Sequence, residues 1–152
     1  MKNMKNRPKI YNPDSLYSKA IKILEDKGIR TTSQRKILTK LIFQNGNRHF
    51  NAEELYKEVN KQEYKISLAT IYNTLKQFTN SNLLREVVVD QNKSIYCTNS
   101  NHHYHLYIED EERIIDIPNR NIDLSNINGI PACLNLHDID IIVRVRTLKN
   151  LN

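Results

Sequence analysis

Hydrophobic residues in the first half of the chain recur at the three- and four-residue spacing of amphipathic helices. Four such segments follow one another, and each begins at a residue type that commonly caps a helix N-terminus. These caps are Asp14, Thr32 or Ser33, Asn51 and Ser67. Gly28 and Gly46 supply stop signals after the first two segments. The pattern therefore predicts four short helices in succession.

The pattern changes after the fourth helix to short β-branched and aromatic runs, which are typical of strands. A hairpin is expected first, from runs 84–89 and 94–97 joined by a polar turn. Three further strands are expected at 104–108, 113–117 and 139–145. The asparagine-rich stretch 118–136 is predicted as loop with one short helix at most.

The third and fourth predicted helices are joined by a short polar link at 62–66, and the hairpin follows directly. This order is that of a helix-turn-helix with a wing. We therefore predict an α+β protein, with an N-terminal winged-helix DNA-binding domain followed by a small α/β domain. The expected parts are a flexible basic arm at 1–13, the winged helix at 14–97 and the second domain at 98–152.

Charge is distributed unevenly along the chain. Residues 1–88 carry 17 Lys/Arg against 8 Asp/Glu, whereas residues 89–152 carry 6 against 9, within a net charge of +6. The arm alone contains Lys2, Lys5, Arg7 and Lys9 and no acidic residue. A basic first half and an acidic second half suit a nucleic-acid-binding domain with a separate regulatory domain. An ordinary basic surface is the alternative.

The remaining composition excludes several classes of protein. No apolar run reaches the roughly 20 residues that span a bilayer, and the first residues lack a secretory signal, so we expect a cytoplasmic protein with no membrane partner. Cys97 and Cys133 stand far apart without CxxC spacing, which provides neither a disulfide framework nor a four-thiolate zinc site. We find no HExxH motif for a zinc hydrolase and expect no enzyme.

The fourth predicted helix leaves hydrogen-bonding side chains on the faces outside its apolar stripe. They are Ser67, Thr70, Tyr72, Asn73 and Lys76. Such side chains can meet base edges and phosphates, so this helix is the candidate DNA reader. A helix-packing unit with a solvated polar face is the alternative that periodicity alone leaves open.

Four of the five histidines, His49, His102, His103 and His105, stand near predicted element ends where the two domains meet. On a strand, His103 and His105 would point to one face and His102 to the other. The pair at spacing two can therefore chelate one metal ion. A surface cluster or satisfied core histidines would give the same pattern.

Four segments resemble the ferric uptake regulator (Fur) superfamily in order and spacing. They are Gly28 to Arg35, His49 to Tyr56, Ser67 to Leu75 and His102 to His105. Asn73 stands where most members carry arginine, and together with Ile115 to Pro118 it resembles the iron response regulator branch. The resemblance implies a dimeric DNA-binding repressor that controls metal homeostasis genes, and assigns dimerisation and sensing to residues 98–152.

The resemblance also implies roles for single residues toward DNA. Tyr72 would read the groove, Gln34 and Arg35 would brace the backbone, and Lys93 in the wing would add a phosphate contact. Asn73 pairs well with adenine, which favours an AT-rich palindromic operator in double-stranded DNA.

Family alignment places His49, His103 and His105 at regulatory metal ligands, but Cys97 stands where a glutamate is usual. A thiolate there would favour Fe²⁺ or Zn²⁺ over Mn²⁺, or serve as a haem axial ligand; a small buried residue is the alternative. A second site would use His102 and His137, although Tyr104 replaces its expected aspartate. The structural zinc site of many members is missing, because Ile108 and Glu111 stand where its first CxxC would lie.

The effector stays open between iron, another divalent metal and haem. The iron response regulator branch is associated with haem, but Cys133 is followed by Leu134 rather than by the proline of a haem motif. A peroxide sensor, in which bound iron oxidises a ligand histidine, would use a similar ligand set. A metal-blind winged-helix module is the third alternative, and the missing glutamate and aspartate support it.

Overall fold

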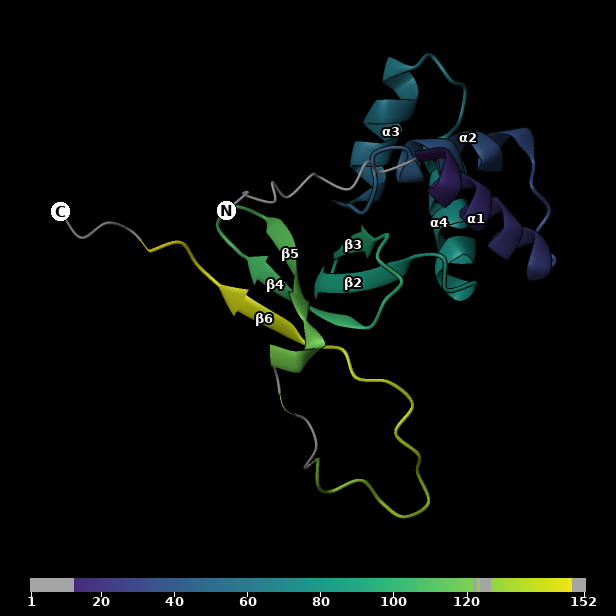
Figure 1. Cartoon of the computed structure of the whole chain (residues 1–152). Coiled ribbons are helices and arrows are strands. Elements are labelled where there is room, and N and C mark those ends of the chain that lie inside the picture. Colours follow the sequence, from purple (N-terminus) through teal and green to yellow (C-terminus); the bar gives the residue numbers. More distant parts are fainter. Residues whose placement is uncertain (1–12, 122, 124–126, 149–152) are drawn as a thin grey trace, which may run out of the picture. The chain divides into compact units, whose positions relative to one another are not determined.

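The computed structural model describes residues 13–121, 123 and 127–148. The chain divides into two compact units, residues 1–100 and 101–152, and each is described by itself (Figure 1). The basic arm predicted at 1–13 lies almost wholly outside the described residues. In the part of the chain that the structure describes, no helix has the length and apolar character needed to cross a membrane.

The first unit contains the four expected helices, α1 (Pro13–Asp26), α2 (Ser33–Phe43), α3 (Ala52–Lys61) and α4 (Leu68–Asn80). Three of the predicted caps form: the Thr32, Asn51 and Ser67 side chains accept hydrogen bonds from the backbone N–H three residues on. Asn51 and Glu54 form a reciprocal capping box. The chain turns after α1 at Gly28, whose φ of +70° favours glycine.

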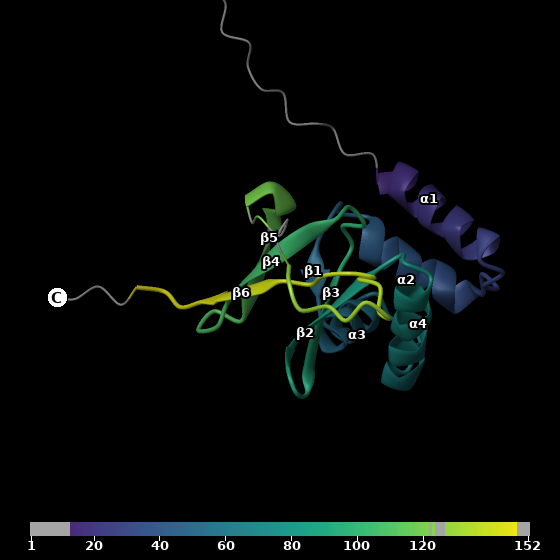
Figure 2. The same cartoon turned by 90° about the horizontal axis from the view of Figure 1, so that it is seen from below.

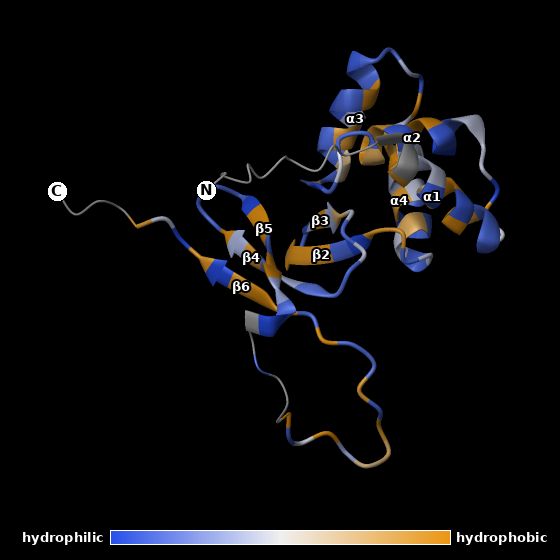
Figure 3. Ribbon diagram, in the orientation of Figure 1, coloured by the Kyte–Doolittle hydropathy of each residue, from blue (hydrophilic) through white to orange (hydrophobic). Residues whose placement is uncertain are grey.

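The apolar stripes of these helices form one core. Helix α1 packs on α2, and α3 packs on both α2 and α4 (Figures 1 and 2). Each helix carries hydrophobic and hydrophilic residues together, as Figure 3 shows by colour. The side chains without solvent exposure include Leu24, Leu38, Ile42, Leu55, Val59, Ile71, Leu75 and Phe78. Burying a side chain of this size contributes roughly 1.5–3 kcal/mol, so the helices are stabilised chiefly by this packing.

A three-stranded sheet completes the first unit, in the order β1 (His49–Phe50), β3 (Lys93–Cys97), β2 (Arg85–Asp90). Strands β2 and β3 are the predicted hairpin, with a register shift between Val88 and Asp90 near the turn. The two-residue strand β1 was not predicted, because it is too short to show a period. It attaches the segment before α3 to the edge of the wing.

The second unit is a three-stranded sheet in the order β5 (Arg113–Pro118), β4 (His103–Ile108), β6 (Ile142–Val145). Strands β4 and β5 are antiparallel, and β6 runs parallel to β4. Strand β6 is shorter than the predicted 139–145, and a 3-10 turn, Asn119–Asn121, follows β5. This sheet fixes the positions of the histidines on β4.

Candidate functional site

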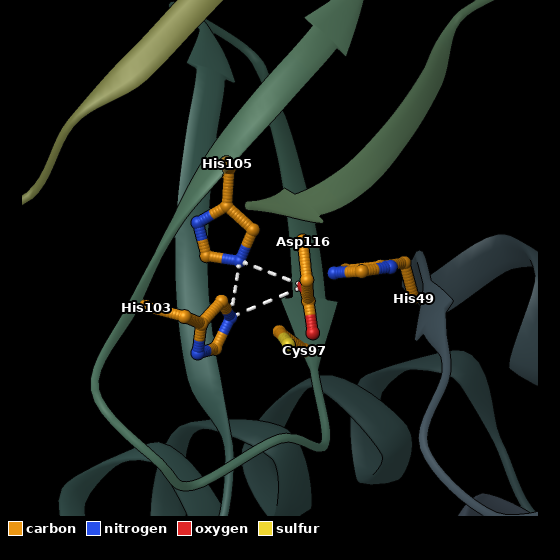
Figure 4. A group of neighbouring side chains, drawn as sticks. All are labelled: His49, Cys97, His103, His105 and Asp116. Atoms are coloured by element: carbon orange, nitrogen blue, oxygen red, sulfur yellow. Dashed lines mark hydrogen bonds and ion pairs between the residues drawn. The ribbon is translucent and has the colours of Figure 1, made fainter. Parts of the chain in front are cut away.

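Two histidines and an aspartate converge on one face of the second sheet. His103 and His105 alternate along β4, and their Nε2 atoms lie 2.9 Å apart. Asp116 on β5 stands opposite His105 in the register. Its Oδ1 lies 3.2 Å from Nε2 of His103 and 3.6 Å from Nε2 of His105 (Figure 4). The predicted pairing of His103 and His105 on one strand face is therefore confirmed.

The surroundings of these side chains suit metal ligands. His103 and His105 are only 5% and 2% exposed. Nδ1 of His103 lies 2.5 Å from the carbonyl oxygen of Asn101, which can only accept, so Nδ1 carries a proton. In the neutral ring the lone pair is then on Nε2, which faces His105 and Asp116. Outer hydrogen bonds of this kind fix the tautomer and orientation of metal-binding histidines.

Asp116 was not among the residues predicted from the sequence. A weak signal was present, since this aspartate interrupts an otherwise apolar strand between Ile114, Ile115 and Ile117. Placing it beside the histidines requires the register of the β4–β5 hairpin, in which His105 pairs with Asp116. Periodicity along one strand does not give that register.

The first unit holds His49 and Cys97 as a second pair of candidate ligands, which Figure 4 also labels. The two residues are direct partners across strands β1 and β3. Cys97 is only 1% exposed, and the backbone N–H of Asn99 donates to its Sγ at 3.4 Å. His49 and Cys97 are thus placed side by side by a strand that the sequence did not predict.

The other two candidate ligands are exposed. His102 precedes β4, and its ring contacts Tyr104 edge-on at 5.3 Å between centroids. His137 lies on the segment before β6. Among the described side chains, neither belongs to a group of His, Cys, Asp and Glu residues close enough to share an ion. The second metal site remains a prediction from the sequence.

Helix α4 presents the predicted DNA-facing side chains to solvent. Ser67, Tyr72, Asn73 and Lys76 are exposed, and Thr70 is half-buried. The Ser67 and Thr70 hydroxyl oxygens lie 2.9 Å apart at the start of the helix. Because Ile71, Leu75 and Phe78 on the opposite face are fully buried, the polar face is held outward. The arrangement matches that of a recognition helix.

Tyr72 is held by a residue that the sequence did not predict. Its hydroxyl donates to Oε1 of Glu53, on the first turn of α3, at 2.5 Å. This hydrogen bond, partial burial and the charge of Glu53 raise the pKa of Tyr72 above its usual value. Burial and the nearby carboxylate of Glu86 raise the pKa of Tyr96 to about 12. Both tyrosines are therefore protonated at neutral pH.

The remaining predicted DNA contacts lie at the start of α2 and in the wing. Gln34 is exposed, whereas Arg35 donates to the carbonyl oxygen of Arg30 at 2.5 Å. Arg35 also lines an open pocket of about 490 Å³ with Lys27 and Arg30. Lys93 begins β3 opposite Asp90, at the turn of the wing. These positions are compatible with phosphate contacts.

The first unit contains a helix-turn-helix with a wing, and the second unit brings together two histidines and an aspartate. These two features together are those of a metal-responsive DNA-binding regulator. The sequence profile of the ferric uptake regulator family matches residues 26–141. The chain belongs to this family and is therefore a transcription regulator and not an enzyme. The predicted superfamily is confirmed, while its iron response regulator branch remains a prediction.

Individual relatives agree with this assignment. The ferric uptake regulation protein of Haemophilus influenzae is 31% identical over 104 residues, which cover 68% of this chain and 71% of that protein. The peroxide-responsive repressor PerR of Staphylococcus aureus is 31% identical over 97 residues, covering 64% of this chain and 65% of the repressor, slightly less than two thirds of its length. Sequence identity thus does not separate the iron-regulator type from the peroxide-sensor type.

The fold is also that of a solved family member. The ferric uptake regulator of Pseudomonas aeruginosa, determined with manganese, superimposes with a TM-score of 0.66 at 22% identity, covering 86% of this chain and 98% of that one. The predicted fold class, an N-terminal winged helix followed by a small α/β domain, is confirmed by this likeness.

Proposed function

We propose that this protein is an iron-responsive transcriptional repressor of metal homeostasis genes, whose affinity for DNA depends on a metal ion bound by His103, His105 and Asp116. The observation that carries the proposal is the convergence of two imidazole Nε2 atoms and one carboxylate oxygen within 3.6 Å. Two unprotonated imidazole nitrogens and a carboxylate oxygen repel one another at such short distances. The same three atoms can each give an electron pair to one divalent cation. The donor set therefore fits a resident metal ion.

We also propose that His49 and Cys97 complete the ligand set. The resemblance to the family assigns His49 to the regulatory metal site. Cys97 is tied to His49 by the strand register and is joined to His103 by the short segment 98–102. Six residue steps span up to about 20 Å, so the connection between the units leaves Cys97 and His103 free to bind the same ion. An ion held by both units would link their movements.

The identity of the donors indicates the kind of ion. Nitrogen ligands with one thiolate and one carboxylate favour Fe²⁺ or Zn²⁺ over Mn²⁺, which prefers oxygen ligands. Haem, with Cys97 or a histidine as axial ligand, is the alternative effector suggested by the resemblance to the iron response regulator branch. The relative that responds to peroxide supports a second candidate function, in which bound Fe²⁺ makes the repressor sensitive to peroxide.

Toward DNA, we propose a cytoplasmic homodimer that binds an AT-rich palindrome. Tyr72, Asn73 and the neighbouring polar residues of α4 would enter the major groove, and Gln34, Arg35 and Lys93 would contact phosphates. A two-fold dimer reads half-sites about one helical turn apart, so a change in the angle between its DNA-binding units alters affinity. To switch strongly, the metal must favour one state by several kcal/mol.

The experiment that tests this function is a DNA mobility-shift titration with Fe²⁺, Zn²⁺, Mn²⁺ or haem added separately, at fixed salt. The DNA is the duplex that the wild-type protein enriches from a randomised pool. His103→Ala is compared with His102→Ala, which removes the adjacent exposed histidine, a ligand of the separate second site predicted from the sequence rather than of this one. We expect one effector to change wild-type and His102→Ala affinity but not that of His103→Ala. DNA binding that ignores every effector would overturn the sensory function.

Peroxide sensing is decided by the same protein loaded with Fe²⁺. Oxidation of His49 or His103 by peroxide, detected as added oxygen in peptide mass spectra together with loss of DNA binding, would support that candidate. Unmodified histidines and unchanged DNA binding would contradict it.

A further inference from the structure

The hydrogen bond between Glu53 and Tyr72 lies on the surface that the proposed function assigns to DNA. Tyr72 is 45% exposed on α4, and Glu53 is exposed on the first turn of α3. The two residues are 19 positions apart and meet at 2.5 Å. An exposed contact of this kind adds little to the free energy of folding. Its place on α4 connects it instead with DNA recognition.

Glu53 is not needed to cap its helix. The capping box of α3 uses Asn51 and Glu54: the Asn51 side chain accepts from the Glu54 N–H at 2.8 Å, and the Glu54 carboxylate accepts from the Asn51 N–H at 3.0 Å. The Glu53 carboxylate is turned instead toward α4, a helix that contains no acidic residue. A carboxylate at a DNA-facing surface repels phosphates and so weakens DNA binding. A role in positioning another side chain would explain why Glu53 lies there.

We propose that Glu53 is a positioning residue that sets how Tyr72 reads DNA, by fixing the ring and by accepting the hydroxyl proton. A tyrosine hydroxyl has one proton to donate and lone pairs that accept. Since the proton is directed to Glu53, the hydroxyl faces the groove as an acceptor. In the major groove the base atoms that donate are N6 of adenine and N4 of cytosine. Tyr72 therefore selects adenine or cytosine at the position it contacts, over guanine and thymine.

The electrostatics of the pair support this assignment. Tyr72 is protonated at neutral pH, and the hydrogen bond to Glu53 is the largest cause of the rise in its pKa. Burial and the charge of Glu86, with a smaller contribution from the charge of Glu53, raise the pKa of Tyr96, which is also protonated. The Glu53 carboxylate is thus the charged acceptor of the group, and the Tyr72 proton has a defined direction.

The inference rests on the proposed role of α4 in DNA reading, and one selection experiment tests both. Wild type, Glu53→Gln, Glu53→Ala, Tyr72→Phe and the double variant Glu53→Ala/Tyr72→Phe are each used to enrich duplexes from one randomised pool. Circular dichroism melting checks that each variant is folded. The readout is the base preference at every position of the enriched site, which a merely structural role of Glu53 would leave unchanged.

We expect Tyr72→Phe to weaken a preference for adenine or cytosine at one position of each half-site by roughly fivefold, the size of one hydrogen bond. Glu53→Ala should weaken the same preference, and the double variant should resemble Tyr72→Phe alone. Glu53→Gln, which still offers an acceptor oxygen, should retain the preference. An unchanged preference in Glu53→Ala, or independent effects that add in the double variant, would overturn the role of Glu53. Absence of any enriched sequence with wild-type protein would instead overturn the DNA-reading function itself.

Discussion

The guanidinium of Arg48 binds both carboxylate oxygens of Glu58, at 3.0 and 2.5 Å, and so joins the residue before His49 to helix α3. The same guanidinium lies 5.0 Å from the centre of the Phe50 ring. The Arg48 backbone is held by Thr98, which accepts from its N–H at 2.7 Å and donates to its carbonyl at 3.1 Å. A proposed metal ligand thus stands on a two-residue strand that is fixed from both sides.

We predict that Arg48→Ala lowers the free energy of unfolding by about 1–2 kcal/mol, because a half-buried bidentate pair and its contact with Phe50 are lost together. Metal affinity should fall about tenfold, since His49 is then poorly positioned. Urea unfolding and metal titration measure the two effects. Arg113→Ala, which removes an exposed pair with Glu111, is the control and should cost less than about 0.5 kcal/mol. Equal effects of the two substitutions would refute the positioning role of Arg48.

Asp116 offers a more direct test of the metal centre. Asp116→Asn keeps the size of the side chain but removes the charge that faces His103 and His105 at 3.2 and 3.6 Å. We expect the affinity for Fe²⁺ to drop about 10- to 100-fold, as measured by competition with a chelator. Asp138→Asn is the matched control, because the Asp138 carboxylate accepts a hydrogen bond from the N–H of Ile139 and does not belong to the group of described residues around His103 and His105. A wild-type affinity in Asp116→Asn would remove this residue from the ligand set.

Local signals in the sequence predicted the helices and the histidine pair. Contacts that depend on how separate elements pair were not predicted. Asn51 was predicted to cap a helix, and in the structure it does so in a reciprocal capping box with Glu54. His103 and His105 needed only the alternation of one strand. The positions of Asp116 beside them and of Glu53 beside Tyr72 depend on how separate elements pair, and no local pattern encodes that pairing.

The hairpin end of the second unit provides a prediction for pH. Asp110, at the turn after β4, accepts hydrogen bonds from the hydroxyl and the N–H of Thr147, and these bonds lower its pKa below the ordinary 3.8. A group with a lowered folded pKa contributes stability above its unfolded pKa and loses it as pH falls through the folded value. We therefore expect Asp110→Asn to lower the melting temperature at pH 7 and to leave it nearly unchanged below the folded pKa.

Thermal melting of wild type and Asp110→Asn from pH 7 down to pH 2 measures this difference. Asn92→Ala, an exposed substitution at the turn of the wing that removes no titratable group, is the control and should shift the melting curve equally at every pH. A constant difference between wild type and Asp110→Asn across the range would show that the Asp110 charge does not stabilise the hairpin end.

Cys97 is either a metal ligand or a small buried residue, and the absorption spectrum of the Co²⁺-loaded protein distinguishes the two. Co²⁺ bound by a thiolate shows an intense sulfur-to-metal charge-transfer absorption, which nitrogen and oxygen ligands do not produce. We expect this band in wild type and in Cys133→Ser, whose cysteine is exposed, and its loss in Cys97→Ser. Cys97→Glu, which supplies the carboxylate usual in the family, should lack the band, bind Mn²⁺ more tightly relative to Zn²⁺ and still bind the metal. Retention of the band in Cys97→Ser would assign the thiolate elsewhere, and absence of the band from wild type would leave Cys97 as a packing residue on β3.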